Sequence, residues 1–225
     1  MLLPDDLLKE TLWAFVLFTC IMLVLMFTKV LYKYMVKRNL KVNVAIYYNR
    51  KLIHVLAGGV TAFLVPYVFT SPLIPTVFAL TIAAILYVPH RRKNVMEWFQ
   101  VSDNAYEVNF CVAWGLSLLA LWLITGNPRY AIIPPLFMSI GDAVTGIIRN
   151  SVYGRRTKSW LGNLGMLAVT VPIGLHYAGI PGIVAAAAST VVEHFEIPPF
   201  LDDNVLIALT SVLVLTLFRG YWTIL

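Results

Sequence analysis

One carboxylate of this sequence lies inside an apolar segment. Asp142 falls in the run from about residue 130 to residue 148, which is long enough to cross a bilayer. An aspartate at the centre of a membrane helix costs roughly 2.5–3.5 kcal/mol on insertion scales, so it is a functional-site candidate. Helical spacing places Thr145, Gly146 and Arg149 on its side of the helix. Two interpretations stay open, a catalytic or metal-binding acid and an Asp–Arg pair that joins two helices.

A basic stretch follows, with the sequence Gly154-Arg155-Arg156-Thr157-Lys158-Ser159. It is not a P-loop, because the glycine expected before the lysine is absent and no strand precedes it. Arginine and lysine nevertheless donate charge-assisted hydrogen bonds to phosphate oxygens, and glycine permits close backbone approach. The stretch therefore indicates either a phosphate site or a basic loop that anchors the chain at the membrane surface.

Acidic and amide side chains form another cluster near the end of the chain. Glu193 and His194 end one apolar segment, and Asp202-Asp203-Asn204 open the next. Oxygen ligands from two or three carboxylates and an amide suit Mg²⁺, which is usually completed by substrate phosphates and water. The alternative is an exposed acidic turn in which the asparagine caps a helix.

Basic residues also open the second apolar segment, where helical spacing places Arg50, His54 and Gly58 on one stripe beside Lys51. This cluster indicates either part of an anion site or a membrane anchor with a satisfied histidine.

Composition identifies the kind of protein that holds these clusters. Of its 225 residues 60% are hydrophobic and 12% charged, and the mean hydropathy is +0.80. A soluble domain has about 25% charged residues, so we predict one integral membrane domain over residues 1–225. The net charge of +6 lies in short loops between apolar segments, which excludes nucleic acid as the expected partner. Cys20 and Cys111 lie within apolar segments and are expected to be packing residues.

Apolar runs predict an all-α bundle of about eight transmembrane helices. The runs are residues 12–34, 53–70, 73–89, 109–125, 130–148, 162–178, 180–195 and 204–222. The run 180–195 is short and opens near Gly179 and Pro181, so a re-entrant segment is the alternative. Cations concentrate in alternate loops, which predicts an external amino terminus and places all four polar clusters on the cytoplasmic side.

These residues resemble the CTP-dependent lipid kinases, the family of dolichol kinase, phytol kinase and the fungal diacylglycerol kinase. The resemblance covers about residues 50–210 and leaves out the first span, 12–34. It rests on Arg50-Lys51 with His54 and Gly58, Gly141-Asp142 with Gly146, Lys158-Ser159 with Gly162, Glu193, and Asp203-Asn204. Asn163 stands where the family pattern has Ser or Thr, and the basic loop is short compared with that of phytol kinases.

The resemblance implies transfer of the CTP γ-phosphate to a lipid hydroxyl, with Mg²⁺ or another divalent cation. Asp142, Lys158 and Asp203 would be catalytic, and Asp142, Glu193 and Asp203 would hold the metal or accept the alcohol proton. The implied nucleotide and phosphate contacts are Arg50, Lys51, His54, Arg149, Gly154, Arg155, Arg156, Lys158, Ser159, Gly162 and Asn204.

The acceptor and the reaction class leave alternatives. A polyprenol or dolichol-like alcohol in the bilayer is the first choice of acceptor, although phytol, geranylgeraniol and diacylglycerol fit the sequence equally well. One alternative enzyme is a cytidylyltransferase that makes a CDP-lipid. A small ion-coupled transporter, with Asp142 and Glu193 as an ion relay, ranks lower because the sequence shows no inverted repeat.

Overall fold

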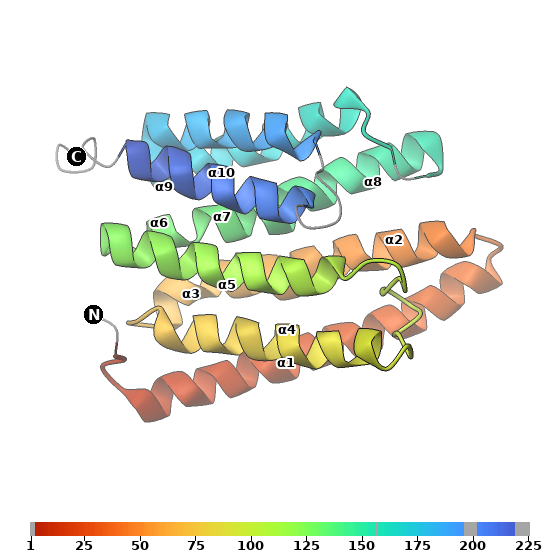
Figure 1. Cartoon of the computed structure of the whole chain (residues 1–225), viewed down its shortest axis with the longest axis horizontal. Helices are drawn as coiled ribbons and strands as arrows, with labels where there is room; N and C mark the ends of the chain where they lie inside the picture. Colours follow the sequence, from red (N-terminus) through yellow and green to blue (C-terminus); the bar gives the residue numbers. More distant parts are fainter. Residues whose placement is uncertain (1–2, 156, 196–201, 219–225) are drawn as a thin grey trace.

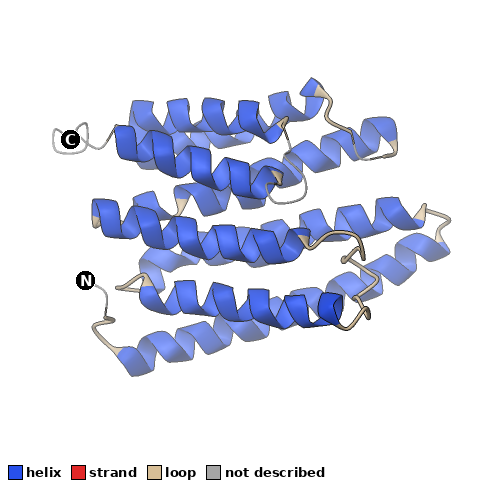
Figure 2. Cartoon of the chain, viewed as in Figure 1, coloured by secondary structure: helices blue, strands red, loops and turns tan. Residues whose placement is uncertain are grey.

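The computed structural model describes residues 3–155, 157–195 and 202–218. These residues form a bundle of helices joined by loops (Figure 2). The α-helices are α1 (Leu7–Lys37), α2 (Val42–Ile53), α3 (Val60–Val68), α4 (Leu73–Arg91), α5 (Tyr106–Thr125), α6 (Pro128–Ala131), α7 (Ile133–Leu136), α8 (Asp142–Tyr153), α9 (Trp160–Glu193) and α10 (Asp203–Leu217). Two π-helical segments complete the series, η1 (His54–Gly59) and η2 (Phe137–Gly141). The prediction of an all-α chain is confirmed.

Six helical segments of the described chain are long and apolar enough to cross a membrane, so the protein is a polytopic membrane protein. They are Leu7–Lys37, Val42–Val68, Leu73–Arg91, Tyr106–Thr125, Pro128–Tyr153 and Trp160–Glu193. The first five agree with the first five predicted spans, apart from their ends. The shorter apolar helix α10 contains the start of the last predicted span, whose final residues, 219–222, lie outside the described residues.

The second segment begins at Val42 instead of residue 53, which corrects the predicted loop. Arg50 and Lys51, expected in that loop, lie in α2 with only 8% and 3% of their surfaces exposed. Arg149, expected in a loop after residue 148, likewise lies in α8 and is 2% exposed. The hydropathy pattern misses these turns of helix because their polar side chains bind other helices and not water.

Helix α9 reverses its direction at Gly179, where the backbone leaves the helical region at φ 59° and ψ −139°. A positive φ of this kind favours glycine. A side chain on Gly174 would overlap the backbone of Gly182, although eight residues of straight helix would separate these positions by about 12 Å. The Asn163 Nδ2 atom also donates to the Thr190 carbonyl at 2.6 Å. The predicted runs 162–178 and 180–195 are therefore the two arms of a helical hairpin.

The ends of α1, α4 and α8 lie at one end of the bundle, on the right in Figure 1. We refer to it as the basic end, because Lys37, Arg91 and Arg155 are found there. The start of α1 lies at the opposite end (Figure 1). Helix α8 packs against α2 and α9, and α10 packs against α9 and α5.

The segment Pro128–Tyr153 is the most buried of the six, and Ile132, Ile133 and Phe137 have no exposed surface. Pro134 and Pro135 each lack a backbone N–H, which is consistent with the irregular start of this segment as α6, α7 and η2. Regular helix begins at Asp142. Asp142 therefore lies directly after the π-helical turn η2, at the start of α8.

The two π-helical segments lie against each other. A side chain on Gly58 of η1 would come within 2.7 Å of Ser139 Oγ in η2 and of Phe110 Cζ in α5. π-Helical turns frequently occur at functional sites. In this chain η1 begins at His54 and η2 ends immediately before Asp142, so both bring a predicted site residue into the interior.

Candidate active site

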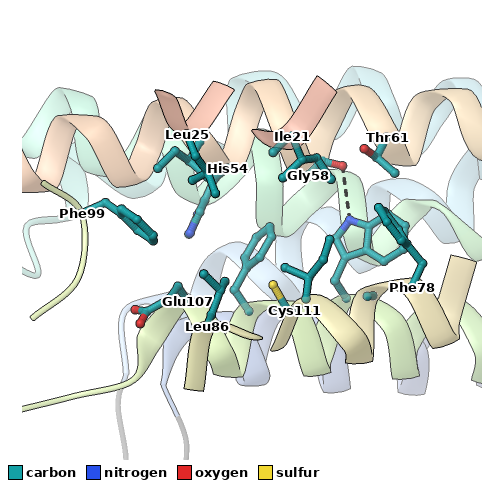
Figure 3. A pocket seen from close by; sticks show the side chains of 16 residues that line it. Ile21, Leu25, His54, Gly58, Thr61, Phe78, Leu86, Phe99, Glu107 and Cys111 are labelled. Carbon is teal, nitrogen blue, oxygen red and sulfur yellow. Dashed lines mark hydrogen bonds between the residues drawn. The ribbon is translucent and has the colours of Figure 1, made fainter. Parts of the chain in front are cut away.

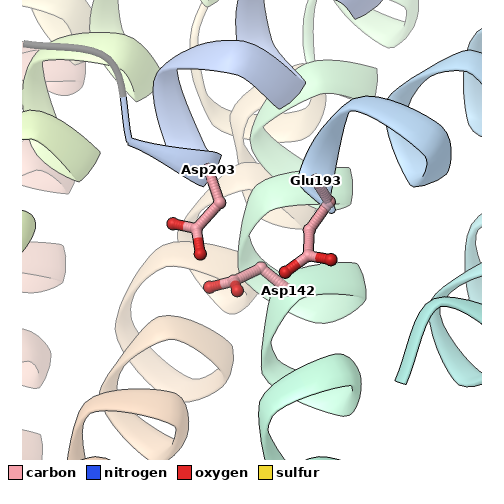
Figure 4. A group of neighbouring side chains, drawn as sticks. All are labelled: Asp142, Glu193 and Asp203. Atoms are coloured by element: carbon pink, nitrogen blue, oxygen red, sulfur yellow. The ribbon is translucent and has the colours of Figure 1, made fainter. Parts of the chain in front are cut away.

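Three carboxylates converge inside the basic end of the bundle. Asp142 opens α8, Glu193 ends α9 and Asp203 opens α10, and their side chains point toward one another (Figure 4). One oxygen from each lies within 4.8 Å of the others. All three residues are buried, with at most 8% of their surfaces exposed. The structure thus brings together the three acids that the family resemblance assigned to a metal.

Asp142 is held by two residues of the second segment. Lys51 Nζ donates to both carboxylate oxygens at 2.6 Å, and His54 Nδ1 lies 3.2 Å from Oδ2. A side chain at Gly146 would overlap Lys51 Cε and come within 2.8 Å of Tyr47 Oη. Glycine at this position therefore lets the lysine pass across α8 to reach the acid.

Glu193 is held by Arg149 in a bidentate pair. The guanidinium nitrogens Nη1 and Nη2 donate to Oε1 and Oε2 at 2.7 and 2.8 Å. Nη2 also donates to Asn163 Oδ1 at 2.7 Å, and Asn163 Nδ2 donates to Glu193 Oε2 at 3.0 Å. Any side chain at Gly162 would press against the Arg149 guanidinium. Arg149, Asn163 and Gly162 together fix the orientation of Glu193.

Lys158 bridges Glu193 and Asp203 at the edge of the cluster. Its Nζ donates to the Glu193 carbonyl at 2.8 Å, to Glu193 Oε1 at 3.4 Å and to Asp203 Oδ2 at 3.1 Å. A quarter of its side chain is exposed, whereas Lys51 and Arg149 are almost fully buried. Of these three cations, Lys158 is thus the one that an incoming anion meets first.

The donor atoms of this cluster fit a divalent cation. The carboxylate oxygens are hard ligands of the kind that Mg²⁺ prefers. Asn204 directly follows Asp203. Its amide oxygen Oδ1 is buried and has no hydrogen-bond partner among the described residues. A buried acceptor without a donor is costly, and a bound cation would satisfy it. Asp142, Glu193, Asp203 and Asn204 are therefore the residues that would hold the ion.

The remaining predicted nucleotide contacts lie near the cluster or at helix ends. The Arg50 guanidinium lies 4.5 Å from the centre of the Tyr106 ring on α5. Gly154 ends α8 with a φ of 62°, a conformation that favours glycine. Ser159 opens α9, where its Oγ accepts from Leu161 N and its carbonyl accepts from Arg149 Nε at 2.9 Å. Arg155 is exposed, and Arg156 lies outside the described residues.

Several residues that complete this end of the bundle were not predicted from the sequence. Asn163 stood out in the sequence only as a departure from the family pattern, and its signal was an amide within the apolar run 162–178. A second acidic group lies on α5, where Glu107 Oε1 accepts from Gln100 Nε2 at 2.7 Å and also from His90 Nε2. An acid just before the predicted apolar run 109–125 was the signal that could have identified it.

Asp202 is a further carboxylate beside the cluster, immediately before α10. Its Oδ1 accepts from Val205 N and its Oδ2 from Asn109 Nδ2, both at 3.0 Å. Burial and the neighbouring Asp203 raise the pKa of Asp202 to about 6. Between about pH 4 and pH 6 the Asp202 carboxyl group is therefore still protonated in the native state, whereas it has lost its proton in the unfolded chain. This group makes the protein less stable as the pH rises through that interval.

We expect Asp202→Asn to stabilise the protein at pH 7.5 by up to about 3 kcal/mol, since each pKa unit corresponds to about 1.4 kcal/mol. Asparagine is an equally good helix cap through its Oδ1, and its Nδ2 can donate to Asn109 once the Asn109 amide turns to present its own oxygen. Melting temperatures of the detergent-purified protein should show this gain at pH 7.5 and only about a third of it at pH 4.5. An equal change at both pH values would contradict the assignment.

Comparison with protein-family models, with curated proteins and with solved structures finds no match for this chain.

Proposed function

We propose that the protein transfers the γ-phosphate of CTP to the hydroxyl of an isoprenoid alcohol in the membrane. The observation that supports this proposal is the convergence of Asp142, Glu193 and Asp203 with Lys51, Arg149 and Lys158 inside a membrane bundle. Phosphoryl transfer requires mainly positioning and charge neutralisation, which carboxylates on a metal and cations on phosphates supply. The choice of CTP and of an isoprenoid acceptor rests on the family resemblance in the sequence.

The ion pairs of the cluster suggest a division of roles. Asp142, Glu193 and Asp203, with Asn204 Oδ1, are the proposed ligands of Mg²⁺, which when bound would neutralise phosphate charge. We assign Lys158 to the phosphates because it is the most exposed of the three paired cations. Arg149 was expected to bind phosphate, but its contacts with Glu193 and Asn163 favour a positioning role.

The proposed reaction exchanges one bond for another at the γ-phosphorus. The hydroxyl oxygen of the lipid forms a bond to phosphorus while the bond from phosphorus to the bridging oxygen breaks, and CDP leaves. The hydroxyl proton passes to a carboxylate at the basic end, for which Asp142 is the first candidate. Lys51 and His54 hold Asp142 in place, and its burial limits the access of water.

We further propose that the chain crosses the membrane eight times, with its amino terminus outside and the basic end in the cytoplasm. The two arms of α9 count separately, and α10 is the last crossing. The remaining loop cations support the orientation, since Lys37, Arg38 and Arg91 to Lys93 lie at one end, whereas Arg129 begins a segment at the other.

Cysteine labelling tests this topology in a protein whose Cys20 and Cys111 are replaced by alanine. We expect Arg38→Cys and Lys93→Cys to react with a membrane-impermeant thiol reagent only from the cytoplasmic side. Arg129→Cys and His176→Cys should react only from outside. All four positions are exposed. Labelling of position 176 from the cytoplasm would show that the α9 hairpin does not cross as proposed.

The enzymatic proposal is tested with purified protein, Mg²⁺, CTP labelled in its γ-phosphate, and a panel of alcohols. We expect labelled lipid phosphate and stoichiometric CDP, with loss of activity on chelation of the metal. Release of pyrophosphate together with a CDP-lipid would instead identify a cytidylyltransferase. Absence of both products with polyprenol, phytol, geranylgeraniol and diacylglycerol would refute the proposed function.

A further inference from the structure

Three contacts at intervals of four residues join the second segment to α5. They are Arg50 with Tyr106, His54 with Phe110, and Gly58 with Trp114. The first is a guanidinium over a ring, the second a stack of two rings with centres 4.0 Å apart, and the third a hydrogen bond of 3.3 Å, drawn as a dashed line in Figure 3. Both chains advance by about 6 Å from one contact to the next, so the contacts form one continuous interface between the two helices.

The first of these contacts contains a buried cation that has no anionic partner among the described residues. Arg50 is 8% exposed, and none of the ion pairs between described side chains includes it. Its Nε is buried and lacks a hydrogen-bond partner in the same part of the chain. Lys51, Arg149 and Lys158, in contrast, each contact a carboxylate. An unpaired buried charge is costly, so an anionic ligand would be stabilised beside Arg50.

His54, in the second contact, relates this cation to the acidic cluster. Its Nδ1 lies 3.2 Å from Asp142 Oδ2. Arg50 precedes His54 by one turn of helix, about 6 Å along the axis. Helix α2 begins at the basic end and runs toward His54 (Figure 1). Arg50 therefore lies about one turn closer to the basic end than the histidine that holds Asp142.

The direction of the proposed reaction indicates which anion this position fits. In phosphoryl transfer the attacking and leaving oxygens lie roughly in line, on opposite sides of the phosphorus. A lipid alcohol approaches from the membrane interior, so the leaving diphosphate must point toward the basic end. Arg50 lies on that side of His54 and Asp142. The planar guanidinium can donate two parallel hydrogen bonds to phosphate oxygens, which suits a diphosphate.

We propose that Arg50 binds the diphosphate that leaves with CDP, and that Tyr106 is the positioning residue that holds the guanidinium for this contact. The inference rests on the proposed function, for which it names the site of the leaving group. The family resemblance implied a nucleotide contact for Arg50 but not the phosphate that it binds, and it gave Tyr106 no role. The face of an aromatic ring attracts a guanidinium most strongly where water is excluded, and the N–H groups in the guanidinium plane remain available to the phosphates.

Calorimetric titration of the purified protein with CDP and Mg²⁺ tests this inference without phosphate transfer. We expect Tyr106→Leu to weaken CDP binding at least about tenfold, and Tyr106→Phe to keep the affinity within about threefold because the ring remains. Weaker binding of CTP with unchanged binding of CDP in folded Tyr106→Leu would place Arg50 at the γ-phosphate. Unchanged binding of both nucleotides would remove Tyr106 from the site. Either result would overturn the proposal.

A second arginine–tyrosine pair supplies a matched control. The Arg38 guanidinium lies 5.4 Å from the centre of the Tyr34 ring, and both residues are exposed near the end of α1. Tyr34→Leu removes the same kind of contact at the same end of the bundle, but far less buried. It should leave the CDP affinity unchanged. A loss as large as that in Tyr106→Leu would show that the effect is not specific to the buried pair.

A double-mutant cycle distinguishes positioning from a general loss of structure. If Tyr106 acts through Arg50, the two residues are coupled, and their effects on CDP binding are not additive. Tyr106→Leu should therefore cause no further loss of CDP affinity in a protein that already carries Arg50→Gln. Additive losses in the folded double variant would overturn the positioning role of Tyr106.

Fluorinated phenylalanine at position 106 gives a second measurement if Tyr106→Leu does not fold. Ring fluorines nearly keep the shape of phenylalanine but withdraw electron density from the ring face, so each added fluorine should weaken CDP binding further. An affinity that does not depend on fluorination would overturn the role of the ring, and phosphate transfer in the same proteins would retain the kinase. Graded CDP binding without transfer to any alcohol would retain this site and refute the kinase.

Discussion

Asp142→Asn is expected to lower turnover roughly a hundred- to a thousandfold, the size of effect seen when one charge-stabilising group leaves a catalytic site. The substitution keeps the shape of the side chain but removes the charge that would serve the metal or accept the proton. It also leaves Lys51 buried without its partner. Breaking a buried ion pair on one side costs about 3–5 kcal/mol, so a lower melting temperature should accompany the loss of activity.

A double variant separates these two effects. Lys51→Met combined with Asp142→Asn removes both charges, and replacing a whole buried ion pair by uncharged groups is often neutral for stability. We expect the double variant to melt close to the wild type and yet to remain inactive. Lys51→Met alone should be unstable, because it leaves the carboxylate unpaired. Near-normal turnover in the folded double variant would show that Asp142 only joins α8 to α2.

Lys158→Arg is expected to lower kcat/KM for CTP about thirtyfold, which corresponds to about 2 kcal/mol of transition-state stabilisation. The ammonium of Lys158 reaches the Glu193 carbonyl and Asp203 from one compact point. The planar guanidinium of arginine is larger and has fixed donor directions, so it cannot occupy the same place relative to a phosphate. Initial rates with varied CTP at saturating alcohol measure the effect.

Lys93→Arg is the matched control, because Lys93 is an exposed loop residue at the same end of the bundle. Membrane orientation depends on charge and not on side-chain geometry, so this change should leave the CTP kinetics intact. If Lys158→Arg leaves them intact as well, Lys158 does not bind phosphate. A fall in melting temperature without a change in kcat/KM would instead assign Lys158 to holding Glu193 and Asp203 in place.

Hydropathy predicted where most long helices lie, because a segment of about 20 apolar residues has few alternatives to a membrane helix. It was wrong about the start of the second segment and about Arg149. Those positions are polar, but two of their cations are paired inside the bundle: Lys51 with Asp142, and Arg149 with Glu193. A hydropathy scale scores each residue by its type alone. It therefore takes no account of an ion-pair partner on a distant helix.

The sequence by itself also determined the list of acids, since a carboxylate in or beside an apolar run is costly and so stands out against its surroundings. Only the tertiary structure decided that Asp142, Glu193 and Asp203 meet within 4.8 Å. That meeting depends on the reversal at Gly179, which returns the end of α9 to its start, and on the packing of α8, α9 and α10. An apolar cavity beside His54, with Leu25, Leu86 and Phe99 in its walls (Figure 3), was likewise invisible in the sequence, because most of its lining consists of ordinary apolar residues from separate segments. The apolar types of these residues favour their burial, whereas the space between them depends on how the helices pack.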